Sequence, residues 1–346
     1  MPRALAAFAL LVVCASISAA RDPEWGGLGA VAASPDGKTV VCGGENRVLY
    51  VLDAATREVK QRIWIQARVG ALAFSKDGTR LCLEDDDEVL HFFDTSTWKE
   101  VQKVADAGDC AFAPTADLCL AISGKENGIR FLSMTDGVEK GKTAIKGRIG
   151  SAGIDAAGTK AVVVMEPEED KAEPKADYSA IPKELKGAAR KEWIQKNDAL
   201  SASVKWFEAP TGKPLAEAKT FFTARGRVGV MSAGEYAWIM PYDDVCARIT
   251  PKGEVTIFEV TTSYNYGRGW SADGKLAIGG GLRSGAICTL DGGTAVKFEV
   301  DRLPGWPEYW AGFTTAADGG FWGVTSACRL VKIAKDGKVE SAGPVY

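Results

Sequence analysis

Short apolar runs separated by tight polar turns recur along this chain. Ser34–Lys38 reads Ser-Pro-Asp-Gly-Lys between two such runs, and the same kind of turn returns at Ser75–Thr79 and Ser271–Lys275. Weaker copies lie at residues 113–116, 155–159, 232–234 and 316–319. The runs are short, alternate between apolar and polar positions, and are rich in β-branched residues. The pattern predicts a series of β-hairpins.

The spacing of these turns predicts the architecture. Equivalent turn positions follow one another after 41, 38, 42, 76, 40 and 45 residues, and the long step is one repeat plus an insertion. A repeat near 40 residues with several short strands is typical of propeller blades. Four of the seven turns contain Asp-Gly, which predicts a two-residue primed hairpin whose central positions need a positive φ. We therefore expect an all-β chain, a seven-bladed β-propeller of four-stranded blades with a partly helical insertion in blade four.

Two further regularities support this prediction. An Asp-x-x-Thr turn precedes the outermost strand of the first two blades, at Asp53–Thr56 and Asp94–Thr97. Small residues such as Gly29-Ala30 and Gly70-Ala71 begin the innermost strands, where backbones should crowd near the axis. Each blade is expected to use four consecutive strands, so that ring closure depends on packing between blades one and seven.

Residues 166–202 interrupt the fourth blade between its second and third strands. The insertion begins with the acidic run Glu166–Asp170 and continues into an amphipathic helix predicted over Ile181–Leu200, with Trp193 on its apolar side. Two interpretations stay open. The insertion is either a loop that packs on the rim, or a lid or docking arm, because long insertions in compact domains are enriched in function.

The first 20 residues predict a secretory signal peptide. Arg3 precedes the apolar run Ala4–Ile17, and small residues lead up to Ala20. The run is too short for an ordinary membrane span. Residues 21–346 are then the propeller, exported to the periplasm or the extracellular space. A formal net charge of −3 gives no indication of a nucleic-acid partner.

The cysteines are expected to be buried thiols. Of eight cysteines, Cys14 lies in the signal peptide and most of the others lie inside apolar strand runs. Export would permit disulfides. Cys110 and Cys119 face each other across one predicted hairpin, so they are the pair to test.

A candidate binding face follows from the topology. In a propeller, the loops between second and third strands and the loops leading into each blade emerge on the same face. The acidic and aromatic candidates there are Glu84, Asp85, Asp86, Asp87, Tyr242, Asp243, Asp244, Tyr266, Trp306, Trp310 and, in the insertion, Trp193. Such a face suits a basic peptide, a sugar or a divalent cation. Alternatively, the acids are solvated turns and the aromatic side chains seal adjacent blades.

Catalytic chemistry has little support. The single histidine, His91, lies in a strand where a packed position is expected, and no Gly-x-Ser-x-Gly elbow or phosphate-binding loop occurs. No catalytic residue is assigned. A calcium ion in the central channel is conceivable, because Asp109 and Asp155 are acids on inner strands, with Arg227 and Arg268 opposing them.

The Ser-Pro-Asp-Gly-Lys hairpin, the small inner-strand residues and the Asp-x-x-Thr turn resemble bacterial WD-repeat-like and YVTN-type β-propeller repeats. The resemblance covers residues 28–346 outside the insertion, but the Gly-His and Trp-Asp pairs of true WD repeats are missing. It implies the fold and transfers no site residue. We expect a protein-binding or scaffold module that uses its loop face, with another protein or peptide as partner. The alternatives are a lactonase-like hydrolase with a channel cation, and a carbohydrate-binding propeller that exposes Trp306, Trp310 or Tyr266.

Overall fold

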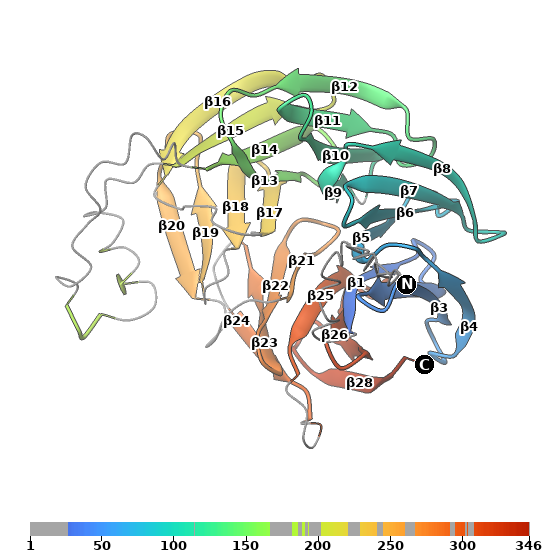
Figure 1. The fold of residues 1–346 in the computed structure, drawn as a ribbon. Coiled ribbons are helices and arrows are strands. Elements are labelled where there is room, and N and C mark those ends of the chain that lie inside the picture. The colour runs from blue at the N-terminus through green and yellow to red at the C-terminus, as the bar shows by residue number, and fades with distance from the viewer. Residues whose placement is uncertain are drawn as a thin grey trace, which may run out of the picture.

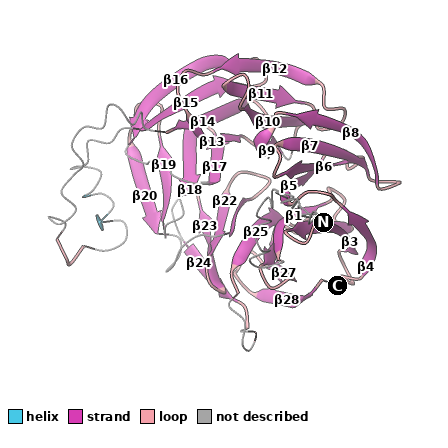
Figure 2. Ribbon diagram, viewed as in Figure 1, coloured by secondary structure: helices cyan, strands magenta, loops and turns pink. Residues whose placement is uncertain are grey.

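A computed structural model describes the chain from residue 27 to residue 345. Within that range it leaves out 114, 167–181, 186–188, 191–192, 194–201, 221–228, 241–244, 260–266, 291–294, 302 and 304–307. The predicted signal peptide and most of the predicted helix of the insertion therefore lie outside the described residues. Strands dominate the described part (Figure 2), and they are arranged as blades around a central axis (Figure 1).

The described strands form seven four-stranded antiparallel sheets, each made of four consecutive strands. The first four blades contain β1 (Leu28–Ala33), β2 (Thr39–Gly44), β3 (Val48–Asp53) and β4 (Val59–Trp64); β5 (Val69–Phe74), β6 (Arg80–Asp85), β7 (Val89–Asp94) and β8 (Lys99–Ala105); β9 (Gly108–Ala113), β10 (Leu118–Ser123), β11 (Gly128–Leu132) and β12 (Glu139–Ala144); and β13 (Ile149–Ile154), β14 (Lys160–Met165), β15 (Ala202–Glu208) and β16 (Lys213–Thr220).

The last three blades contain β17 (Gly229–Ala233), β18 (Tyr236–Met240), β19 (Val245–Ile249) and β20 (Val255–Glu259); β21 (Gly267–Trp270), β22 (Leu276–Gly280), β23 (Ser284–Thr289) and β24 (Ala295–Glu299); and β25 (Trp310–Thr315), β26 (Phe321–Thr325), β27 (Arg329–Ile333) and β28 (Val339–Pro344). The predicted seven-bladed propeller is confirmed. The insertion also lies where it was predicted, between β14 and β15, which pair as the second and third strands of blade four.

The hydrophobic core is divided among the interfaces between neighbouring blades. In β14, Ala161 and Val163 pack toward blade three, whereas Val162 and Val164 pack toward blade five. All four side chains are buried. Because alternate residues of a strand point to opposite faces, a strand covered on both faces needs an unbroken apolar run. This requirement explains why the second and third strands lack the alternation of a half-exposed sheet.

The ring closes by packing and not through a shared sheet. The strands of blade one pair only with one another, and so do those of blade seven. Leu28, Val31 and Val40 of blade one share a buried cluster with Trp322 and Val324 of blade seven. This arrangement confirms the expectation that closure depends on the interface between the first and last blades.

The Ser-Pro-Asp-Gly-Lys turn differs in type from the prediction. Ala33 pairs with Val40, and the Ser34 N–H donates to the Thr39 carbonyl, so the connection is longer than a two-residue hairpin. Only Gly37 in this turn has a positive φ, at 70°. The predicted primed turn is therefore wrong. Asp36 supplies the missing constraint, because its Oδ1 accepts hydrogen bonds from the Ser34 hydroxyl at 2.6 Å and the Lys38 N–H at 3.0 Å.

The second recurring turn also depends on an aspartate. Asp94 Oδ1 accepts the N–H groups of Ser96 and Thr97, each at 3.0 Å, and the Ser96 hydroxyl at 2.6 Å. These donors, the Ser96 hydroxyl foremost, lower the pKa of Asp94 from its ordinary 3.8 to about 2. Asp53 holds the equivalent turn of blade one through the N–H groups of Ala55 and Thr56. The Asp-x-x-Thr pattern is thus a capped turn in both blades.

These aspartates predict how stability depends on pH. The pKa of Asp94 is lower in the folded state than in the unfolded state, so its contribution is complete above about pH 4 and is lost as the pH falls toward 2. Asp94→Asn retains an acceptor oxygen but no longer titrates. We expect the variant to lose less stability than the parent between neutral pH and about pH 3, as measured by urea unfolding. Parallel losses in the two proteins would contradict this assignment.

Small residues on the inner strands are required by close backbone approach and by bulges. A Cβ added to Gly153 in β13 would lie 2.2 Å from the carbonyl oxygen of Val230 in β17. Register shifts also leave an extra residue in the inner strand opposite its partner, namely Gly29 in β1, Gly70 in β5 and Gly150 in β13. Crowding near the axis was predicted, whereas the bulges were not.

The seven cysteines of the described residues are free thiols, and all except Cys110 and Cys328 are buried. The expectation of buried thiols is confirmed for these five. Cys119 pairs in register with Phe112 and not with Cys110. The two thiols are nevertheless neighbours, because a hydrogen bond that the Cys110 thiol donates to the Cys119 sulfur, together with desolvation, raises the pKa of Cys110 well above its usual range.

Candidate functional site

The innermost strands enclose a cavity of about 720 Å³ along the propeller axis. Blades one to seven all contribute to its wall, and the hairpin turns around Pro35, Ala156, Asp273 and Ala317 surround one end. A volume of several hundred cubic ångströms is within the range of small-molecule sites. The channel is therefore the candidate functional site in the described part of the chain.

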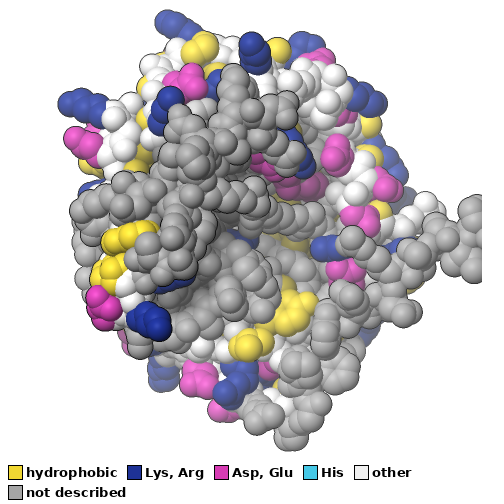
Figure 3. All heavy atoms as spheres, turned by 60° about the vertical axis from the view of Figure 1, so that its left-hand side comes forward, with side chains coloured by type: hydrophobic (Ala, Val, Ile, Leu, Met, Phe, Trp, Pro, Cys, Tyr) yellow, Lys and Arg dark blue, Asp and Glu magenta, His cyan; other side chains and the backbone are white. Residues whose placement is uncertain are grey.

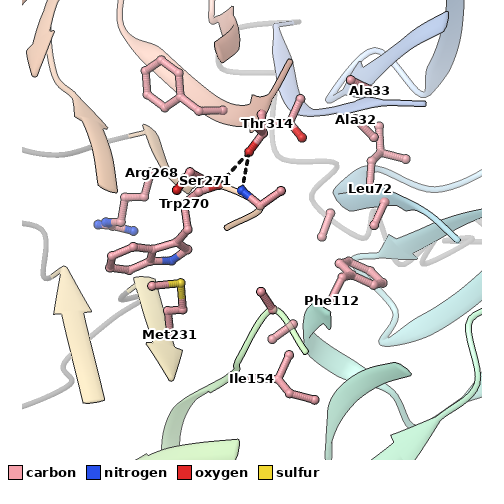
Figure 4. A pocket seen from close by; sticks show the side chains of 18 of the residues that line it. Ala32, Ala33, Leu72, Phe112, Ile154, Met231, Arg268, Trp270, Ser271 and Thr314 are labelled. Atoms are coloured by element: carbon pink, nitrogen blue, oxygen red, sulfur yellow. Dashed lines mark hydrogen bonds between the residues drawn. The ribbon is translucent and has the colours of Figure 1, made fainter. Parts of the chain in front are cut away.

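Most of the channel wall is apolar. In six blades, the residue immediately before the hairpin turn lines the cavity; these residues are Ala33, Phe74, Phe112, Ile154, Trp270 and Thr315. Figure 4 shows Leu72 and Phe112 on one side of the open space, with Trp270 and Met231 on the other. The side chains occupy equivalent places because the turn fixes the register of each inner strand. An apolar body of suitable size would lose its contact with water here.

Hydrogen bonds hold part of this wall in place. The Thr315 hydroxyl donates to the Trp270 carbonyl at 3.2 Å and accepts the Ala272 N–H at 2.9 Å, which links blades six and seven (Figure 4). Phe313 packs against Trp310 with ring centroids 4.9 Å apart. Phe313, which lines the cavity, is therefore supported from behind by the buried Trp310.

Acidic groups are concentrated on the blade-two and blade-three side of the channel. Asp109 is exposed and lines the cavity, and its φ of 44° is unusual for a residue other than glycine. Glu84 is 7% exposed, and its two carboxylate oxygens accept the N–H groups of Asp109 at 2.7 Å and Cys110 at 2.8 Å. Glu84 thus fixes the backbone that carries Asp109.

Basic groups on the wall are fewer and lie elsewhere. Arg268 comes from β21 in blade six and lies beside Trp270 (Figure 4). Lys335 lies near the hairpin-turn end, together with Asp273. The predicted opposition of Asp109 and Arg268 is confirmed in one respect, because both line the same channel from different blades.

The acidic run at residues 84–88 does not form one exposed cluster. Glu84 and Asp85 belong to β6 and are buried, whereas Asp86 and Asp87 are exposed. Asp85 Oδ1 accepts the N–H groups of Asp87 and Val89, and Asp86 Oδ1 accepts the Arg68 N–H. Three of the four candidate acids therefore serve the local fold, and Asp87 is the exposed acid without such a contact in the described residues.

His91 is packed, as predicted. It is 6% exposed, and its Nε2 lies 2.8 Å from Asp85 Oδ2 while its Nδ1 lies 2.9 Å from Glu100 Oε1. Lys103 also reaches Glu100, at 3.2 Å. The imidazole bridges β6 to the outer strand β8 and does not line the channel. Its contacts are those of a structural residue.

The aromatic candidates for the binding face differ in their exposure. Trp310 has no exposed surface, and its Nε1 donates to the Arg283 carbonyl at 3.0 Å. It seals blades six and seven, so it cannot stack on a sugar in this conformation. Trp193 is half-buried. The other candidates on that face lie outside the described residues and stay predictions; they are Tyr242, Asp243, Asp244, Tyr266 and Trp306.

The two acids predicted on inner strands do not meet in the channel, because Asp109 lines the cavity and Asp155 is not among the described residues of its wall. Asp155 accepts hydrogen bonds from the Thr159 N–H and hydroxyl within its own turn, at 2.6 and 2.5 Å. Across the described ranges, no three His, Cys, Asp or Glu side chains are grouped so that they could hold a metal ion. Within the same ranges, no helix is long and apolar enough to cross a membrane.

Both signs of charge are interspersed on the described part of the surface in Figure 3.

No protein-family model matches this sequence, and no curated protein matches it. The fold and the channel together define a seven-bladed propeller of the kind that suits a binding or scaffold module.

The sequence predicted a central channel with Asp109 and Arg268 on its inner strands, but not the apolar and aromatic wall of that channel. The aromatic candidates were expected only in loops. The available signal was the apolar or aromatic residue directly before the turn, as in Phe74-Ser75 and Trp270-Ser271. That signal becomes visible only when the repeats are aligned on their turns.

Proposed function

We propose that this chain is an exported binding module whose ligand site is the central channel. The observation that carries the proposal is the apolar and aromatic wall of a cavity of about 720 Å³, formed by all seven blades. A site of this kind binds mainly by burying apolar surface, and a few polar groups then fix the orientation of the ligand. Export rests on the sequence of residues 1–20.

Binding is favoured over catalysis by the chemistry of the wall. Its described residues include no histidine, and its buried acid, Glu84, is occupied by backbone N–H groups. A hydrolase would need a nucleophile with a base, or a metal-bound water. A protein partner at the loop face remains a separate prediction, because five of its eleven candidate residues lie outside the described part.

Filling the channel should abolish ligand binding. Thr314 is half-buried and lines the cavity (Figure 4), so Thr314→Trp adds an indole inside it. N-phenyl-naphthylamine, an uncharged fluorophore, is expected to bind the parent protein saturably and to bind the variant at least about tenfold more weakly, a loss of about 1.4 kcal/mol.

The matched control is Val101→Trp, because Val101 is 53% exposed on the outer strand β8 and receives the same bulk outside the channel. This variant should bind the fluorophore like the parent protein. Equal weakening by both substitutions, or saturable binding that Thr314→Trp leaves intact, would contradict a channel site.

Calcium titration separates this proposal from the hydrolase alternative. Calorimetry on metal-stripped protein, followed by a thermal melt, would detect a bound ion as released or absorbed heat and a raised melting temperature. Tight calcium binding that Asp109→Asn removes would favour a channel cation, and thus the hydrolase, over a binding module.

A further inference from the structure

We propose that the channel selects an organic cation, that is, an ammonium group carried on an apolar body, and that Asp109 binds the ammonium group. This inference rests on the proposed function, because it names the ligand class of the same site. Three observations carry it: the position of Asp109 in the repeat, the rigid support of its backbone, and the aromatic composition of the wall.

Asp109 is an exception at its position in the repeat. Four residues before the start of the hairpin turn, the other blades with this turn carry only small residues, which are Ala30, Ala71, Ser151, Gly267 and Gly312. Blade three places a carboxylate there, exposed on the channel wall. In the described residues, no hydrogen bond or ion pair to this carboxylate is formed. The wall therefore carries a charge that is not used by any contact within the described part of the fold.

The backbone that carries this carboxylate is held in place by Glu84. Glu84 is held inside the wall by its two hydrogen bonds, at 2.7 and 2.8 Å, to the N–H groups of Asp109 and Cys110. Charge-assisted bonds of this kind are stronger than neutral ones. A ligand would therefore meet a preorganised group, which lowers the ordering cost of binding. Glu84 acts here as a positioning residue.

The aromatic wall favours the same ligand charge. Phe74, Phe112 and Trp270 line the cavity that Asp109 lines. The face of an aromatic ring attracts a cation within about 6 Å of its centroid, and tryptophan does so best. A carboxylate together with aromatic faces in one mainly apolar channel is chemistry suited to an alkylammonium or arylalkylammonium ion. A carboxylate ligand would meet repulsion from Asp109 and Glu84.

The basic residues of the wall set the orientation. Arg268 lies beside Trp270 in blade six, and Lys335 lies toward the hairpin-turn end. The ammonium group is therefore expected on the blade-two and blade-three side, next to Asp109, and the apolar body is expected against the residues that precede the turns.

Three probes with the same alkyl chain test the ligand class: octylammonium, octanol and octanoate. Calorimetry at low ionic strength should show octylammonium binding about tenfold more tightly than octanol, with octanoate the weakest. In Asp109→Asn, the affinity for octylammonium should fall to within about twofold of the affinity for octanol, and the affinity for octanol should stay unchanged. Asparagine tolerates the left-handed backbone at this position, and an unchanged melting temperature would show that the variant is folded.

The possible results distinguish failure of the cation proposal from failure of the proposed function. Octanoate binding as tightly as octylammonium, or an octylammonium preference that survives in Asp109→Asn, would overturn the cation proposal while the channel site stands. No saturable binding of any of the three probes, nor of the uncharged fluorophore, would overturn the proposed function itself. High salt should reduce the preference for octylammonium over octanol and leave the affinity for octanol unchanged, because salt screens only the interaction between the two charges.

Discussion

Replacing Arg329 by methionine is expected to lower the free energy of unfolding by about 3–5 kcal/mol. Arg329 and Glu308 form a bidentate ion pair in blade seven, with side chains 8% and 1% exposed. The Thr325 hydroxyl donates to the same carboxylate at 2.6 Å, and an Arg329 N–H donates to the Asp301 carbonyl at 2.9 Å. Methionine would leave a buried carboxylate without its counter-charge. Urea unfolding of parent and variant measures the loss.

Two variants make this expectation specific. Glu308→Gln combined with Arg329→Met removes both charges and should recover much of the lost stability. Arg148→Met breaks an exposed pair with Glu166, in which the arginine side chain is 79% exposed, and should cost less than about 1 kcal/mol. If Arg148→Met and Arg329→Met cost the same, burial would not control the strength of the blade-seven pair.

Gly153→Ala should destabilise the protein by about 1–3 kcal/mol, and the effect should lie at the upper end of that range. The new Cβ would lie 2.2 Å from the Val230 carbonyl oxygen and 2.8 Å from the Met231 nitrogen. Both atoms belong to the backbone of β17, which cannot rotate aside as a side chain can. Blades four and five would have to separate near the axis. A drop in melting temperature is the readout.

Gly70→Ala is the matched control for this substitution. Gly70 is also on an inner strand, but an added Cβ there would meet only the Glu84 carbonyl oxygen, at 3.4 Å, which is ordinary contact. Its cost should stay within about 0.5 kcal/mol. Equal melting temperatures for the two variants would mean that β13 and β17 can move apart without cost, and that the close approach does not constrain the ring.

Most of the fold could be predicted from the sequence because each blade is encoded locally. The turn at Ser34–Lys38 and its copies repeat in phase with the Asp53 and Asp94 turns, so strand order and blade number follow from the spacing. The turn type could not be predicted this way. The hydrogen bonds of Asp36, and not an Asp-Gly pair with two positive φ angles, determine its geometry.

The site was harder to predict because it is assembled from distant parts of the chain. Phe74, Phe112 and Trp270 each come from a different blade, and no local pattern states that they share a cavity. Glu84 was hard to predict for a different reason, because its local sequence pattern was misleading. Its place in an acidic run indicated solvent exposure, yet its carboxylate is buried because it accepts two backbone N–H groups.

The interface between blades one and seven has a consequence for the order of folding. Six of the seven blade interfaces join segments that are neighbours in sequence, so they can form one after another as the chain emerges. The interface between β1 and β25–β26 joins segments almost 300 residues apart in sequence, so its loop-closure entropy is the largest. Until it forms, the partial ring exposes two apolar faces, around Val40 and Trp322, with the same surface chemistry as any other blade interface. A chain stalled at this stage would therefore be able to stack end to end with a second copy, and closure of this one interface removes both of the faces that such stacking needs.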